Sequence, residues 1–421
     1  MIMTLSSEKF KENTKKVVAN NKIVIVAIIV RLVALIVIYL TRDHLAGGFV
    51  GSDTYYDDFR YEAGGEYYAR VATSIIDIPA FTRAYASVGD WVGYKLQNPF
   101  TSTPLWYWIV CVIMYVFKTK WVVRIFNIFF ASISIFYIYD FVNNICGEEI
   151  AEKTSWLMAL LPYPVIFSCF SYKDQFVMFI TFYLLDKAVR YKYYGSLKIR
   201  ELLTGVLLAL LLLLTRSGLT AILLAICFFI AFSNLLNSNE GISRKEFFII
   251  PIALIVILLL MYRFSSTIGF KLGYYINRHE ETLTNTSISF ITINSFRDIY
   301  KLPFTYLFSM IMPINLFGKI DSWYAIVSNI NIIMCPISVG AFLEIFKRKY
   351  DKAVYWGCMI LYLVSIIASI NIFRHYYSLI PITLMNYSSF RQKVDDKNYI
   401  LYLSLTFGFI ALLLMFYGFR G

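Results

Sequence analysis

The sequence lacks the residue patterns of several common protein classes. Its six cysteines show no CxxC spacing and no pairing with histidine, of which there are only three. Neither a zinc site nor a disulfide framework is therefore predicted, and we expect the cysteines to be small core residues. No internal repeat, low-complexity tract or soluble domain interrupts the chain. The first apolar run, residues 23–40, is too long for a signal-peptide core and lacks a small-residue cleavage site, so we expect it to remain as a helix.

Apolar residues are abundant instead. Hydrophobic residues make up 59% of the chain, and the mean hydropathy is +0.63. An ordinary soluble domain could not bury that much apolar surface. Apolar runs of about 16–22 residues recur from residue 22 to the C-terminus, and each is about long enough to cross a bilayer. The composition predicts an all-α polytopic membrane protein, with residues 1–421 forming a single integral membrane domain.

The formal net charge of +12 does not indicate a nucleic-acid partner, because the cations lie in short loops between the apolar runs. This is the positive-inside pattern, in which basic loops stay in the cytoplasm. With two short apolar runs (104–117 and 303–317) treated as interfacial, the chain crosses the membrane about 11 times. The predicted layout has a cytoplasmic N-terminus over 1–21, a first outer loop over 41–120 and a second outer loop over 263–324.

Within this layout, residues 154–170 form one span, 202–214 and 219–236 form a pair joined by a tight outer turn, and 376–387 form a late span. The stretch 143–153 is expected to be a cytoplasmic loop, although it contains three Glu and one Lys. Acidic residues contribute little to the charge rule, so this loop is still assigned to the cytoplasm. We expect a cytoplasmic (inner) membrane of bacterial type, with the functional site on the extracytoplasmic face.

An acidic, tyrosine-rich segment follows the first apolar run. Asp58, Glu62 and Glu66 are spaced at i, i+4 and i+8, so a helix here would carry a stripe of carboxylates. Arg60 and Arg70 could compensate the repulsion between them. One interpretation is a solvated loop helix; the other is a functional site, because tyrosines beside carboxylates suit sugar binding. Both interpretations remain open on the residues alone.

Two further groups of polar residues lie at predicted outer ends of spans. Lys173 and Asp174 follow two prolines that should break a helix end, and an ionisable pair beside kinked apolar helices indicates function, although a local ion pair in a turn is the simpler alternative. Arg216 and the Arg374-His375 pair lie in tight outer turns. Arginine suits phosphate because its planar fork donates two hydrogen bonds, whereas the alternative is anchoring to lipid headgroups.

The pattern of one helix, a long acidic outer loop, proline-containing helix ends and a late basic-aromatic motif resembles the GT-C superfamily of polyprenyl-phosphate-dependent glycosyltransferases. The motifs that carry the resemblance are Asp57-Asp58-Phe59-Arg60-Tyr61-Glu62, Lys173-Asp174 and Arg374-His375-Tyr376-Tyr377 ahead of Pro381. The resemblance covers the chain loosely from residue 22 to about residue 381. The chain lacks the C-terminal soluble domain and WWD-type motif of oligosaccharyltransferases, which argues against protein N-glycosylation.

The resemblance implies an essential aspartate in the first outer loop, which would be Asp58, with Asp57 or Asp53 as alternates. A second acidic residue would be Asp174. It also implies inversion at the anomeric carbon. Clustered carboxylates could hold Mg²⁺ or Mn²⁺, although nothing in the sequence requires a metal. The residues expected to bind substrate or phosphate are Arg374, His375, Arg216, Lys173, Glu66 and Tyr61.

Three functions are weighed. The first is a glycosyltransferase that moves a sugar from a polyprenyl-phosphate-linked donor to a glycan or lipid acceptor of the cell envelope, in contact with membrane lipids. The second is a repeat-unit polymerase of the capsule or O-antigen type that uses polyprenyl-diphosphate oligosaccharides. The third is a flippase or transporter of lipid-linked sugars, which should show internal repeats and charges along a midplane path. Neither feature is visible in the sequence, so the third is the least favoured.

Overall fold

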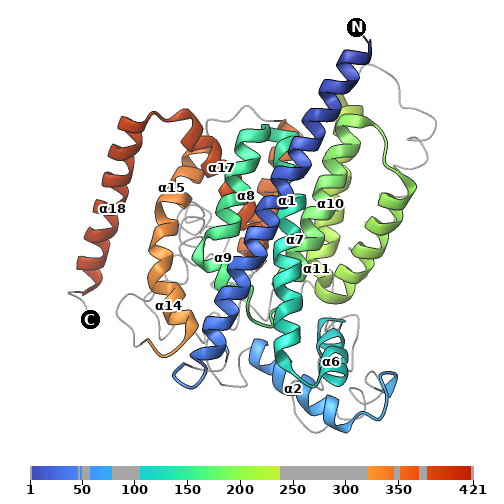
Figure 1. The fold of residues 1–421 in the computed structure, drawn as a ribbon. Helices are drawn as coiled ribbons and strands as arrows, with labels where there is room; N and C mark the ends of the chain where they lie inside the picture. Colours follow the sequence, from blue (N-terminus) through green and yellow to red (C-terminus); the bar gives the residue numbers. More distant parts are fainter. Residues whose placement is uncertain are drawn as a thin grey trace.

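The computed structural model describes residues 2–45, 48–49, 57–77, 105–237, 320–345, 351–368 and 377–418. Within these ranges the regular elements are all helices (Figure 1). In chain order they are α1 (Ile2–Leu40), α2 (Asp57–Val71), α6 (Leu105–Phe117), α7 (Lys120–Cys146), α8 (Glu148–Leu160), α9 (Pro162–Phe167), α10 (Asp174–Tyr194), α11 (Ile199–Asn237), α14 (Trp323–Ile330), the short 3₁₀ helix η4 (Asn331–Ile333), α15 (Met334–Ile345), α16 (Lys352–Ala368), α17 (Ile380–Lys393) and α18 (Asp396–Gly418).

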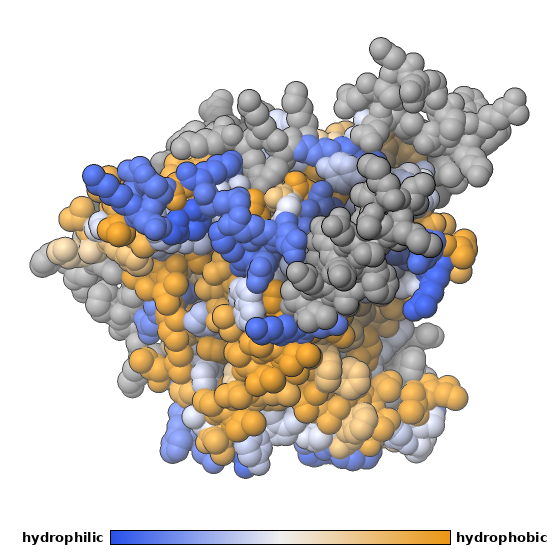
Figure 2. All heavy atoms as spheres, turned by 45° about the horizontal axis from the view of Figure 1, so that its top comes forward, coloured by the Kyte–Doolittle hydropathy of each residue, from blue (hydrophilic) through white to orange (hydrophobic). Residues whose placement is uncertain are grey.

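The architecture is that of an all-α membrane protein. Three helical stretches are long and apolar enough to cross a bilayer: Asn21–Leu40, Lys120–Cys146 and Trp323–Ile345. Apolar side chains cover the middle of the bundle, and hydrophilic residues gather toward its ends (Figure 2). Such a belt is the surface that hydrocarbon chains would contact. The predicted class is confirmed, whereas the predicted count of 11 spans is not.

α2, which carries the stripe of carboxylates, and the helix ends that carry basic residues lie at opposite ends of the bundle (Figure 1). At one end, the C-terminus of α1 meets the N-terminus of α7, where the rings of Tyr39 and Trp121 are 4.9 Å apart, and α2 and α6 lie alongside. At the other end, Lys192 of α10 pairs with Asp351 at 2.5 Å, just before α16 begins. The positive-inside rule then predicts that the end with the basic residues faces the cytoplasm.

The predicted pair of apolar runs at 202–214 and 219–236 is confirmed as a helical hairpin. Arg216, with φ −155° and ψ 73°, interrupts α11. The first arm starts beside the C-terminal half of α10, where the Tyr183 hydroxyl donates to the Glu201 carbonyl at 3.1 Å. The second arm returns to the same end, where Phe232 lies 5.4 Å from the ring of Tyr191. The turn at Arg216 is therefore at the end of α10 that carries Asp174.

Two predicted boundaries are wrong. The expected loop at 143–153 is largely helical, because α7 continues to Cys146 and α8 begins at Glu148, with only Gly147 (φ +89°) between them. Glutamates in a first helical turn are favoured by the helix dipole, which the charge-based prediction ignored. The late span expected at 376–387 overlaps α17, which begins at Ile380 and runs on to Lys393, where basic residues suit the last turn of a helix.

The expected single span at 154–170 is also two helices. α8 ends at Leu160, Leu161 has extended backbone (φ −61°, ψ 134°), and α9 begins at Pro162. A residue before proline avoids helical backbone, and proline itself is well tolerated in the first helical turn because it has no N–H to lose. The chain after α9, residues 168–173, then leads into α10 without regular structure.

Labelling from outside the cell tests which end faces out. Thr73 follows α2, and Ser196 lies in the turn between α10 and α11; both are exposed. In cells that express cysteine-free protein, we expect Thr73→Cys to react with an impermeant maleimide. Ser196→Cys should react only after permeabilisation. Labelling of Ser196→Cys in intact cells would contradict the predicted orientation.

Candidate functional site

The carboxylate stripe of α2 is divided between the protein interior and the surface. α2 is helical, and it lies against α6 with its first turns over the start of α7. Asp58 and Glu62 are buried, with 1% and 4% of their surface exposed, whereas Glu66 is exposed and pairs with Arg70 at 2.6 Å. A solvated loop helix would expose all three, so this interpretation fails for the first two carboxylates.

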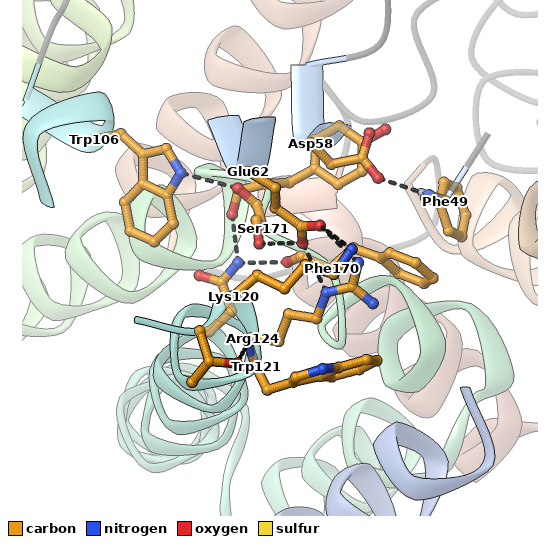
Figure 3. A network of polar contacts seen from close by, with 12 residues as sticks. Phe49, Asp58, Glu62, Trp106, Lys120, Trp121, Arg124, Phe170 and Ser171 are labelled. Atoms are coloured by element: carbon orange, nitrogen blue, oxygen red, sulfur yellow. Dashed lines mark hydrogen bonds and ion pairs between the residues drawn. The ribbon is translucent and has the colours of Figure 1, made fainter. Parts of the chain in front are cut away.

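Asp58 is joined to the chain that leaves α1. Its Oδ2 accepts a hydrogen bond from the backbone N–H of Phe49 at 2.6 Å (Figure 3). The Phe49 ring is fully buried and packs edge-on against Phe167 and Phe170, with centroids 5.3 and 5.2 Å away. The Phe49 carbonyl accepts from the Tyr324 N–H at 2.7 Å. Asp58 is therefore held where segments from three distant parts of the chain meet.

Glu62 forms a two-pronged ion pair with Arg124 of α7. Arg124 Nε lies 2.7 Å from Oε1, and Nη2 lies 2.9 Å from Oε2. The Ser171 hydroxyl donates to Oε1 at 2.7 Å, and Lys120 Nζ is 3.4 Å from Oε2 (Figure 3). Charge compensation was expected from Arg60 and Arg70; for Glu62 it comes from Arg124, and the Arg60 side chain lies outside the described residues.

Burial and the neighbouring cations together set the ionisation of Glu62. The Arg124 guanidinium is 1% exposed and lies 4.7 Å from the Trp121 ring centroid and 5.0 Å from that of Phe170. Burial raises the pKa of Glu62, but Arg124, Lys120 and the Ser171 hydroxyl outweigh burial and hold that pKa below its usual range. Glu62 is thus ionised at neutral pH, and its oxygens already accept from Arg124 and Ser171. It suits a clamp that holds α2 to α7 rather than a proton acceptor.

Side chains from three helices hold the non-helical segment 168–173. Asn127 Nδ2 of α7 donates to the carbonyls of Phe170 and Tyr172 at 2.5 and 2.8 Å. The Trp106 indole of α6 donates to the Ser171 carbonyl at 2.9 Å. Gln175 Nε2 of α10 donates to the carbonyl of Phe167, the last residue of α9, at 2.9 Å. Buried irregular backbone is stable only when protein groups satisfy its carbonyls, and these three side chains do so here.

Asp174 begins α10 directly after this segment. It is 2% exposed, and its Oδ1 lies 3.4 Å from Nη1 of Arg216, at the break in α11. A carboxylate in a first turn is also stabilised by the helix dipole. Lys173, half-buried, immediately precedes the helix. The structure therefore joins two predicted site residues, Asp174 and Arg216, that are 42 positions apart.

The other predicted site residues lie as follows. Tyr61 is half-buried, with its ring 6.0 Å from that of Tyr107. Asp57 is the first residue of α2, and its side chain is not described. Asp53, Arg374 and His375 lie outside the described residues. Within the described ranges, no three His, Cys, Asp or Glu side chains are grouped so as to hold a metal ion.

Two buried arginines were missed by sequence reasoning. Arg124 and Arg31 are 1% and 0% exposed, and both lie inside apolar helical stretches. Their signal in the sequence was a single cation within a run otherwise long enough to span, a position that is costly in lipid. Comparison of the sequence with protein-family models and with curated proteins finds no match.

Two glycines allow α2 to lie close to α6. A Cβ on Gly64 would lie 1.6 Å from the Tyr107 hydroxyl oxygen, and one on Gly65 would lie 2.8 Å from Val110 Cγ1. We expect Gly64→Ala to destabilise the protein by about 1–3 kcal/mol through overpacking. Detergent-driven unfolding in mixed micelles measures this. Gly408→Ala in α18, where an added Cβ would meet nothing within 4 Å beyond the adjacent backbone of its own helix, is the control. Equal effects of the two substitutions would contradict close packing of α2 on α6.

Proposed function

We propose that the protein is a membrane glycosyltransferase that moves a sugar from a polyprenyl-phosphate-linked donor to a glycan or lipid acceptor on the extracytoplasmic face, with inversion. The observation that supports this best is that α2, the segment 168–173 and the Asp174–Arg216 pair meet at one end of the bundle. Asp58 is tied to Phe49, which packs on Phe167 and Phe170, and Asp174 follows that same segment. This end of the bundle lies opposite the helix ends that carry basic residues (Figure 1).

The residues match what the reaction needs. Transfer from a lipid phosphate requires a carboxylate that takes the acceptor proton as the sugar bond breaks, and we assign that role to Asp58. It also requires cations where charge builds on the departing phosphate. We assign that role to Arg216, which lies 3.4 Å from Asp174 and has a side chain that is 20% exposed, because its planar fork suits phosphate. Glu62 and Arg124 act as a clamp that keeps α2 over the site.

Reconstitution tests the proposal. Purified protein in nanodiscs is given either a polyprenyl-phosphate sugar or a polyprenyl-diphosphate oligosaccharide, each with a glycan or lipid acceptor. We expect transfer of a single sugar from the monophosphate donor. Chain growth from the diphosphate donor alone would favour a repeat-unit polymerase. If neither donor is consumed while both partition into the discs, the enzyme proposal fails.

A further inference from the structure

Arg31 lies inside α1 with no exposed surface, within the apolar stretch Asn21–Leu40. Its neighbours along the same helix at Ile29 and Val33 are exposed apolar residues, so Arg31 is on the face that packs inward. No carboxylate oxygen in the described part of the chain lies within ion-pair distance of it. An arginine at this depth is expensive, and its retention indicates a specific use.

Arg31 instead binds the end of a broken helix. Its Nη2 donates to the Met158 carbonyl at 2.9 Å, and its Nη1 donates to the Ala159 carbonyl at 3.3 Å. These are carbonyls of the last turn of α8, which the break at Leu161 leaves without helical partners. The C-terminal end of a helix carries partial negative charge, so the guanidinium meets both a hydrogen-bonding need and a compensating charge.

Arg31 also contacts the chain beyond the break. Its backbone carbonyl accepts from the Cys169 thiol at 3.4 Å. Cys169 lies in the segment that carries Ser171 and leads to Asp174. Within α9, the Pro164 carbonyl accepts from the Tyr377 hydroxyl at 3.4 Å. One residue of α1 therefore joins α8 on one side of the break to the site-bearing segment on the other.

We propose that Arg31 is a positioning residue. It caps α8 across the interface with α1 and thereby fixes the break at Leu161, so that residues 168–174 are presented to the site. Arg31 is far too buried to touch a substrate and acts only through the segment that it holds. Its effect on sugar transfer rests on the proposed function, whereas its hold on the segment does not.

Thiol reactivity measures that hold directly. The intact protein in nanodiscs is treated with a small uncharged maleimide, and the labelling of each native cysteine is followed by mass spectrometry. Cys169 reports on the segment, while Cys111 in α6 and Cys335 in α15, both buried, report on the rest of the fold. We expect Arg31→Met to raise the labelling rate of Cys169 by about tenfold or more, because local opening exposes it, and to leave the other two unchanged.

Two further variants complete the test. Arg31→Lys keeps the charge and can still donate to a carbonyl, so its Cys169 rate should lie between wild type and Arg31→Met. Arg42→Met removes an exposed charge at the end of α1 and should leave all rates unchanged. A wild-type Cys169 rate in Arg31→Met would overturn the proposal, as would a parallel rise at all three thiols. If Arg31→Met does not fold, Arg31→Lys is judged by the same criteria.

Transfer assays on the same samples separate the two proposals. In a wild type that transfers sugar, Arg31→Lys should lower kcat, with KM for the donor little changed, because the donor contacts remain. If the wild type transfers nothing, the proposed function fails, yet the labelling of Cys169 still decides the role of Arg31.

Discussion

Asp58→Asn should lower turnover by about 10²–10⁴-fold, the usual contribution of a positioned general base, while expression and donor binding remain. The substitution suits the structure, because an asparagine side-chain oxygen can still accept the Phe49 N–H that Asp58 accepts at 2.6 Å. It removes the basic carboxylate and keeps the contact. Turnover is measured on the reconstituted protein with a polyprenyl-phosphate sugar donor.

The alternative role for Asp58 is only to anchor Phe49, and the same variant distinguishes it. If the anchor is all that matters, Asp58→Asn keeps near-native turnover and Asp58→Leu loses both stability and turnover. Asp57→Asn and Asp53→Asn are the necessary comparisons, because three nearby carboxylates compete for the role. Asp43→Asn, at a carboxylate just after α1 that is 82% exposed, is the control and should leave turnover unchanged. Full activity in all three Asp variants would remove the main support for an enzyme.

Local features of the fold could be predicted where the sequence carries them. The spacing of Asp58, Glu62 and Glu66 indicated which carboxylates would share a face if the segment were helical, and the two apolar runs at 202–214 and 219–236 predicted the hairpin of α11. The start of α8 was missed because its glutamates were read as a loop, although they favour a helix N-terminus. The number of spans could not be decided by run length, since the bundle combines long helices with short and broken ones.

The contacts of the site could not be predicted in the same way. Glu62 meets Arg124 across 62 positions, and Arg31 meets Ala159 across 128. Which cation compensates which carboxylate depends on how the helices pack, and spacing along the chain does not contain that information. An isolated arginine inside an apolar run was nevertheless a usable signal, because lipid would reject it unless protein groups surrounded it.

The clamp between Glu62 and Arg124 should dominate the stability of the α2 end. We expect Arg124→Met to destabilise the protein by about 3–5 kcal/mol, since it removes the two-pronged partner of a buried carboxylate and leaves it, among the described residues, with Lys120 and Ser171. Glu62→Gln should cost a similar amount, because it removes the carboxylate that two nitrogens of the buried Arg124 guanidinium bind. The double variant should cost much less than the sum. Detergent-driven unfolding of the four proteins gives the coupling energy directly.

The exposed pair on the same helix is the matched control. Glu66 and Arg70 are separated by 2.6 Å, as close as the buried pair, but 60% and 75% of their side chains are exposed. Glu66→Gln and Arg70→Met should each cost about 0–1 kcal/mol, because water already solvates both charges. If substitutions in the buried and the exposed pair cost similar stability, burial of Glu62 would not be what strengthens its ion pair.

Acidification provides an independent check on the same clamp. Because the pKa of Glu62 is lower in the folded protein than in the unfolded chain, the unfolded chain binds the proton more readily. The stability that Glu62 contributes is present at neutral pH and is lost as the pH falls below about 4, through the folded pKa. Wild type should therefore lose stability in this range, and Glu62→Gln should lose less. If the two proteins lost the same stability as the pH falls, Glu62 would not be held ionised by Arg124.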